Sequence, residues 1–194
     1  SWVSILFSSI YPPDCEMKKN VPLVPILFSG IIIIVDQITK ALVVKYIPEG
    51  RVFARILGDF VWIVHTRNRG AAFSIGALSP QPLRFLFFIC LPIVVLIALL
   101  FYYFKSERLS PILRYSIGLI VGGGIGNLID RILRPQGVVD FISVNMYGFL
   151  GMERFATFNI ADSAITIGEI LLILGFLILE FHKPKAQSSQ SEKG

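Results

Sequence analysis

The chain has 194 residues, of which 54% are hydrophobic and only 16% are charged, and its formal net charge is +5. This composition lies outside the balance of a soluble globular domain and indicates an integral membrane protein. The basic residues are scattered through the loops, so the net charge makes no case for binding nucleic acid. Two cysteines are too few for a disulfide framework.

The beginning and the end of the chain differ in character from the rest. Met17-Lys18-Lys19 resembles a natural start, with positive charge directly before an apolar run. Residues 1–16 are therefore expected to be a non-native or disordered extension that takes no part in the fold. We expect residues 17–182 to form a single membrane domain and residues 183–194, which are polar, to form a disordered cytoplasmic tail.

Four apolar runs are long enough to cross a bilayer, which requires about 20 residues. They are residues 22–44, 82–104, 111–133 and 160–181. The prediction is an all-α membrane fold with a core of four transmembrane helices. Basic residues before the first span, in the short second loop and after the last span favour a cytoplasmic location for both ends. The first external loop is also rich in Lys and Arg, which weighs against this orientation.

The first span contains Asp36 and Lys40, which are four residues apart and so share one helical face where they can pair. Ionisable side chains inside a span are costly to bury in lipid and indicate a functional site by default. Two interpretations remain open from these residues alone. The pair either supports such a site or is a purely structural ion pair near the outer end of the helix.

The first external loop, residues 45–81, has the pattern of folded structure rather than of a linker. Residues 60–66 are β-branched and aromatic, which predicts a strand. Asn68-Arg69-Gly70 then suits a tight turn that exposes backbone donors. Residues 141–144 and 155–158 of the last external loop are expected to complete a small sheet. His65 has no second histidine or cysteine at ligand spacing, so no metal site is expected.

The second span carries no charge between Arg84 and Lys105 and is interpreted as structural. In the third span, Gly118, Gly122 and Gly126 recur every four residues. A stripe of small residues at this spacing predicts that another helix packs closely against the third span.

Three polar residues, Asn127, Asp130 and Arg131, follow at the outer end of the third span and share one helical face. Asn127 offers both hydrogen-bond donors and an acceptor. The Arg131 guanidinium suits an anionic headgroup or a substrate carbonyl. Asp130 is expected to pair with the neighbouring arginine as a structural support.

Two further carboxylates flank the last external loop. Asp140 follows the third span, and Asp162 stands three residues after Asn159 at the start of the fourth. A chain that leaves the bilayer and re-enters it does so on one side, so both aspartates lie at the same membrane face. Glu169 lies seven residues beyond Asp162, about two turns deeper along the same helical face, and has no assigned role.

Two carboxylates held close together share one proton, so that one activates water while the other polarises a scissile carbonyl. This chemistry hydrolyses peptides without a metal or cofactor. Two aspartates in loops are commonplace, and other functions remain open. Asp36, Lys40 and Glu169 suit the relay of a small proton-coupled transporter, although the chain lacks evident repeated halves. A non-enzymatic membrane chaperone would use every polar residue structurally.

Five motifs occur in order across the four spans. They are Asp36-x-x-x-Lys40, Asn68-x-Gly70-Ala71-Ala72-Phe73, Gly126-Asn127-Leu128-Ile129-Asp130-Arg131, Val138-Val139-Asp140-Phe141 and Phe158-Asn159-x-Ala161-Asp162. Each motif alone is loose, but the ordered set on this hydropathy pattern is specific. From about residue 17 to residue 182 the chain resembles the bacterial lipoprotein signal peptidases, also called signal peptidase II.

The resemblance implies an aspartic endopeptidase of the bacterial inner membrane whose active site is at the extracytoplasmic face. Such enzymes remove signal peptides from prolipoproteins just before a diacylglyceryl-modified cysteine, work among membrane lipids and are inhibited by globomycin. The resemblance also implies a small extracytoplasmic β-cradle formed by the first and last external loops. By position, it assigns Asp140 and Asp162 as the catalytic pair, Asn68, Gly70, Asn127, Arg131 and Asn159 as substrate-binding residues, and Asp36, Lys40 and Asp130 as supports of the site.

Overall fold

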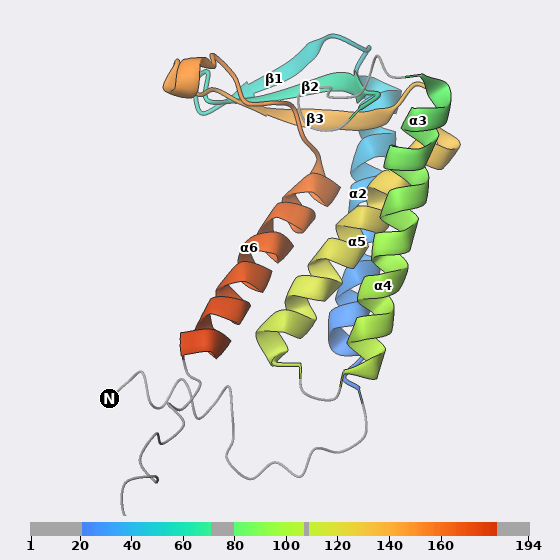
Figure 1. The fold of residues 1–194 in the computed structure, drawn as a ribbon. Helices are drawn as coiled ribbons and strands as arrows, with labels where there is room; N and C mark the ends of the chain where they lie inside the picture. Colours follow the sequence, from blue (N-terminus) through green and yellow to red (C-terminus); the bar gives the residue numbers. More distant parts are fainter. Residues whose placement is uncertain (1–20, 71–79, 107–108, 182–194) are drawn as a thin grey trace, which may run out of the picture.

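The computed structural model describes residues 21–70, 80–106 and 109–181. The extension expected at 1–16 and the tail expected at 183–194 lie outside these residues. Long helices run alongside one another, and a three-stranded sheet lies across one end of them (Figure 1). The central helix is α5, because α2, α4 and α6 all pack against it.

The helical spans agree closely with the sequence prediction. They are α2 (Val24–Tyr46), a second span made of α3 (Gln81–Phe85), a π-helical segment η2 (Leu86–Cys90) and α4 (Leu91–Lys105), then α5 (Pro111–Leu133) and α6 (Ile160–Phe181). All four spans are long and apolar enough to cross a membrane. The third and fourth have the predicted bounds. The first lies two residues later than predicted, because α2 begins with Pro25 in its first turn.

The second span contains a π-helical turn that the sequence analysis did not predict. Proline has no backbone N–H, and its ring collides with the carbonyl four residues earlier in a regular α-helix. Pro92 lies two residues after the end of η2, so this carbonyl belongs to Phe88 within the π-helical segment. The wider π turn makes room for the proline ring without ending the span.

Burial in the helices is inverted relative to a soluble protein. Leu27, Ile97 and Ile173 point outward and are 67%, 61% and 59% exposed. In contrast, the side chains of Asp36 and Lys40 are completely buried. An apolar exterior around a polar interior is the arrangement expected when lipid surrounds the helices.

The glycine stripe of α5 faces α2, as predicted. A Cβ atom at Gly118 would lie 2.5 Å from the Pro25 carbonyl oxygen, and the Ser29 hydroxyl donates to the Gly118 carbonyl at 2.6 Å. The neighbouring Gly123 instead faces α6, where a Cβ would collide with the Ala161 carbonyl oxygen. Close backbone approach on two sides therefore fixes α5 between α2 and α6.

The sheet consists of β1 (Val52–Ile56), β2 (Val61–Asn68) and β3 (Val138–Val144), antiparallel and in that order. The strands expected at 60–66 and 141–144 correspond to β2 and β3. The segment expected at 155–158 does pair with β3, through backbone hydrogen bonds at Phe155 and Phe158, but it forms a single isolated bridge and not a regular strand. The chain must turn into α6 at Ile160, which ends the pairing. The mostly exposed β1 was not predicted, because it lacks alternating burial.

We predict that Gly123→Ala lowers the melting temperature of the detergent-solubilised protein, because the added methyl group pushes α6 away from α5. Overpacking of this kind costs about 1–3 kcal/mol. Gly30→Ala in α2 is the matched control, since nothing lies within 4 Å of a Cβ at that position. Equal melting temperatures for the two variants would contradict the close packing at Gly123.

Candidate active site

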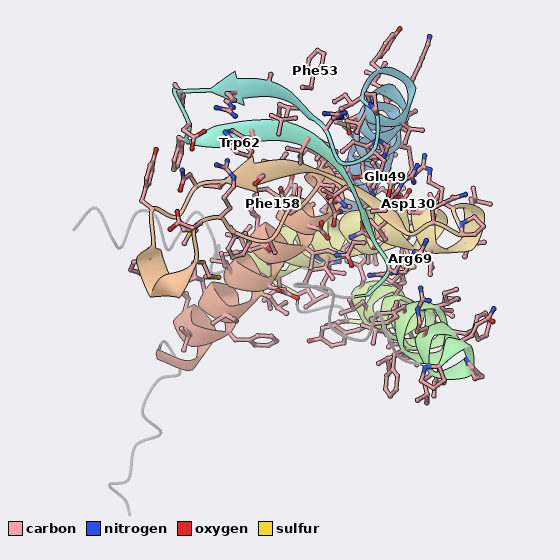
Figure 2. All side chains as sticks on the ribbon, turned by 90° about the horizontal axis from the view of Figure 1, so that it is seen from above. Glu49, Phe53, Trp62, Arg69, Asp130 and Phe158 are labelled. Carbon is pink, nitrogen blue, oxygen red and sulfur yellow. The ribbon has the colours of Figure 1, made fainter. Side chains whose placement is uncertain are left out.

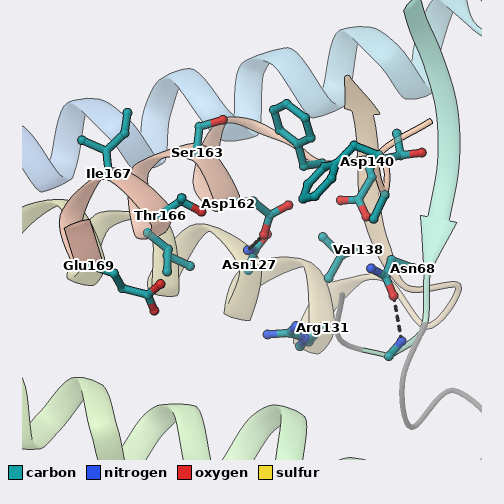
Figure 3. A pocket seen from close by; sticks show the side chains of 16 residues that line it. Asn68, Asn127, Arg131, Val138, Asp140, Asp162, Ser163, Thr166, Ile167 and Glu169 are labelled. Carbon is teal, nitrogen blue, oxygen red and sulfur yellow. Dashed lines mark hydrogen bonds between the residues drawn. The ribbon is translucent and has the colours of Figure 1, made fainter. Parts of the chain in front are cut away.

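A cavity of about 690 Å³ lies where the sheet meets α5 and α6. Asn127 and Arg131 of α5, Asp140 of β3 and Asp162 of α6 all border it. Figure 3 shows these side chains, which come from distant parts of the sequence, directed into one space. The two aspartates that the sequence places at one membrane face are thus brought to a single cavity.

The first turn of α6 positions Asp162 through a reciprocal pair of hydrogen bonds. The backbone N–H of Asp162 donates to Asn159 Oδ1 at 2.9 Å, and the backbone N–H of Asn159 donates to Asp162 Oδ2 at 3.1 Å. This is a capping box, in which the residue before the helix and the third helical residue satisfy each other's orphan donors. It fixes the Asp162 carboxylate at the helix N-terminus, where the helix dipole favours negative charge.

Asp140 lies on β3 and is only 3% exposed. Asn159 Nδ2 donates to Asp140 Oδ1 at 2.7 Å. Burial and then the nearby charge of Asp162 raise the pKa of Asp140 to about 7, against the opposing effect of hydrogen bonds from Asn68 and Asn159. This carboxyl therefore holds or releases its proton near neutral pH.

Asn159 is the residue that the two aspartates share. Its side chain donates to Asp140 and its backbone N–H donates to Asp162. Asn127 Nδ2 also donates to Asp162 Oδ1, at 2.7 Å, and Asn159 Nδ2 lies 3.2 Å from Asn127 Oδ1. Two asparagines thus orient both carboxylates with hydrogen bonds that come from fully or nearly fully buried groups.

Behind the cavity, a buried ion-pair network supports Asn127. Lys40 Nζ donates to Asn127 Oδ1 at 3.0 Å and lies 2.8 Å from Asp36 Oδ2 and 3.3 Å from Asp130 Oδ2. Asp36 in turn accepts the backbone N–H of Ala161 at 3.0 Å. Asp36 and Lys40 therefore form the pair that their spacing predicts, and the pair is part of the support of the cavity.

Asp130 does not pair with Arg131 as the sequence analysis expected. It forms a salt bridge with Arg134 and another with Lys40, and its Oδ2 accepts the Val139 N–H at 3.0 Å. Neighbouring helical residues point in different directions, whereas residues four apart share a face. For this reason Arg134, rather than Arg131, is the arginine within reach of Asp130.

Arg131 is consequently left facing the cavity. Its guanidinium lies 5.6 Å from the centre of the Phe88 ring, which belongs to the π-helical segment. Within the described parts of the chain it forms no salt bridge with a carboxylate. A cation held this way is available to a ligand carbonyl or phosphate.

The turn after β2 also reaches the cavity. Asn68 Oδ1 accepts the backbone N–H of Gly70 at 2.9 Å, which is an Asx-type turn, and both residues border the cavity. The remainder of that motif, residues 71–73, lies outside the described residues.

Other residues of the site were missed. Gln37 donates to Gly126 O at 3.0 Å and to Asp130 Oδ1 at 3.1 Å. A polar residue next to Asp36 within an apolar span was the signal that could have identified it. The segment 155–158 lines the cavity instead of forming a regular strand.

Comparison with known proteins gives a consistent result. The family model described as signal peptidase (SPase) II matches residues 28–178. A lipoprotein signal peptidase of Treponema pallidum (strain Nichols) is 44% identical over 171 residues, which cover 88% of this chain and 91% of the relative. One from Borrelia hermsii is 44% identical over 159 residues, covering 82% and 92%.

Solved structures are also similar. A bacterial membrane enzyme determined by the in meso method at 2.3 Å resolution matches with a TM-score of 0.71 and 35% identity, covering 92% of this chain and 98% of that chain. A second, at 1.9 Å resolution, has a TM-score of 0.69 and 36% identity, covering 84% and 97%. The fold of a helical membrane protein with a small sheet agrees with the prediction. The sequence matches show that this chain is a multi-pass membrane peptidase and belongs to the signal peptidase II family.

Proposed function

We propose that this peptidase removes the signal peptide from prolipoproteins by cutting before the diacylglyceryl-modified cysteine, with Asp140 and Asp162 as its catalytic pair. The relatives are named lipoprotein signal peptidases, which supports the substrate class. The observation that carries the mechanism is the junction at Asn159, which donates one hydrogen bond to each aspartate at the edge of a cavity.

The unequal surroundings of the two aspartates suit a division of roles. Because the pKa of Asp140 is raised to about 7, this carboxyl keeps a proton that it can donate to the scissile carbonyl oxygen. Asp162 accepts hydrogen bonds from Asn127 Nδ2 and from the Asn159 backbone N–H. Such donors stabilise the ionised carboxylate. Asp162 takes a proton from water as the water oxygen attacks the carbonyl carbon. Asp140 gives its proton to the carbonyl oxygen, which forms a tetrahedral intermediate. When the C–N bond of this intermediate breaks, Asp162 passes its proton to the leaving amine and a hydroxyl of the intermediate returns a proton to Asp140.

The remaining cavity residues suit an extended peptide. Arg131 supplies a cation for peptide carbonyls, and Asn127 adds a polar contact beside Asp162. Asn68 and Gly70 border another part of the cavity, whereas Asn159 is completely buried, does not line the cavity and acts through its hydrogen bond to Asp140. We expect a cyclic peptide of the globomycin type to occupy the same space and to inhibit by competing for these contacts.

The same geometry supports a proposal for the membrane setting of the site. The sheet lies at the end of the helices opposite to the end of α4 and the start of α5 (Figure 1), and the cavity is lined by residues at the sheet end. Lys105, in the last turn of α4 at that opposite end, favours the cytoplasm. The site would then stand at the extracytoplasmic face of the inner membrane, where a lipid-anchored substrate reaches it from the surrounding lipid.

Asp140→Asn and Asp162→Asn should each lower cleavage of a lipidated prolipoprotein peptide by about 10²–10⁴-fold, because each removes a proton-transferring group. The measurement is kcat/KM of the purified variants. Asp59→Asn, the same chemical change in the β1–β2 turn at a half-exposed carboxylate paired with Arg154, is the control and should cleave at the wild-type rate. Near wild-type cleavage by either site variant would contradict the mechanism.

The cleavage rate should also depend on pH. Below about 7, Asp140 carries the proton that the mechanism needs, and above that value it loses it. We expect kcat/KM to fall by roughly tenfold per pH unit on the alkaline side. A rate profile between pH 5 and pH 9 tests this, and a flat profile up to pH 9 would assign the proton to another group.

The thermal stability of the protein reports the protonation of the Asp140 carboxyl without requiring an activity measurement. The pKa of Asp140 is raised from 3.8 in an ordinary carboxyl to about 7 in the folded protein. The folded state therefore binds more protons between these values, and its stability falls as pH rises through this window. Asp140→Asn should melt at a higher temperature than wild type at pH 8, and the difference should shrink at pH 5. The same difference at both pH values would contradict the raised pKa.

A further inference from the structure

Glu169 is an ionisable side chain that neither the proposed mechanism nor the buried network uses. It is exposed on α6 and borders the cavity. Within residues 21–70, 80–106 and 109–181, its carboxyl has no salt bridge or hydrogen-bond partner. A carboxyl inside a membrane span is unfavourable without a partner and is a functional candidate by default.

The geometry of α6 places Glu169 in the wall of the cavity that we propose binds the substrate. Asp162, Thr166 and Glu169 stand at spacings of four and three, so they form one stripe along α6, and all three line the cavity (Figure 3). The intervening Gly168 fixes the rotation of α6, since a Cβ there would lie 2.9 Å from the Ser116 carbonyl oxygen of α5. α6 therefore cannot rotate the backbone at Glu169 away from the cavity without separating the two helices.

The chemistry of the carboxyl indicates the group that it recognises. The flanking Ile167 and Ile170 are each 52% exposed, so the wall around Glu169 is apolar on the lipid side. A hydroxyl both donates and accepts a hydrogen bond, so Ser or Thr satisfies the carboxyl whether or not it is ionised. Leucine at the same place would leave the carboxyl without a partner in an apolar site.

We infer that Glu169 is a specificity-determining residue that selects a Ser or Thr side chain in the signal segment of the substrate. This inference rests on the proposed function. Glu169 lies seven positions after Asp162, which is about 10 Å along α6. An extended peptide covers that distance in about three residues and a helical one in about seven. The selected position therefore lies three to seven residues before the scissile bond.

The test uses lipidated peptides with an all-leucine signal segment, into which a single serine is introduced at each position from one to nine residues before the scissile bond. For the wild-type enzyme, kcat/KM should rise by about tenfold for serine at one position between three and seven. Glu169→Leu should lose this maximum. Glu169→Gln, whose amide also donates and accepts, should keep it, which separates loss of recognition from loss of folding.

Glu49→Leu is the matched control, because it makes the same change at an exposed carboxylate outside the cavity, and it should keep the serine maximum. An identical serine profile for wild type and Glu169→Leu would overturn the inference while leaving the proposed function intact. A wild-type profile without any serine maximum would also overturn the inference and leave the proposed function intact. Failure of the wild type to cleave every peptide in the series would overturn the proposed function and the inference together.

Discussion

The buried ammonium group of Lys40 is the interaction on which the rest of the structure depends. It lies between Asp36 and Asp130 and donates to Asn127, and all four side chains are at most 4% exposed. Isolated charges at such depth are prohibitively costly, so each is retained only because its partners surround it. Arg134 adds the second positive charge that balances the two carboxylates. The network joins α2 to α5 and, through backbone donors, to β3 and α6.

The candidate site uses the ends of the elements that this network fixes. Figure 2 views this end of the molecule from above and labels Asp130 of the network and Phe158 of the cavity wall. Asp130 accepts the Val139 N–H, one residue before Asp140, and Asp36 accepts the Ala161 N–H, one residue before Asp162. Each supporting carboxylate thus anchors the backbone next to one aspartate of the cavity. Asn159 then connects the two halves. The same residue begins α6 and orients both aspartates, so local helix formation and assembly of the site cannot be separated.

Much of this arrangement could be predicted because it follows from helical spacing and hydropathy. The bounds of α5 and α6, the pairing of Asp36 with Lys40 and the close contact at Gly118 all depend on local patterns. What could not be predicted depends on tertiary contacts. To predict the partner of Asp130, one would need to know where Arg134 lies. To predict that Asn159 donates to both aspartates, one would need to know that β3 lies beside α6. The short, exposed β1 has no alternating burial pattern from which it could be predicted.

The spacing of Asp36 and Lys40 also has a consequence for biosynthesis. The residues that complete their network lie 87 or more positions later in the chain, since Lys40 meets Asn127 at a separation of 87 and Asp36 meets Ala161 at 125. A nascent first helix therefore enters the bilayer before those partners have been translated. Because the two charges are one helical turn apart, each serves as the counter-ion of the other from the outset. The Asp36–Lys40 pair of α2 thus carries no net charge before α5 and α6 are inserted.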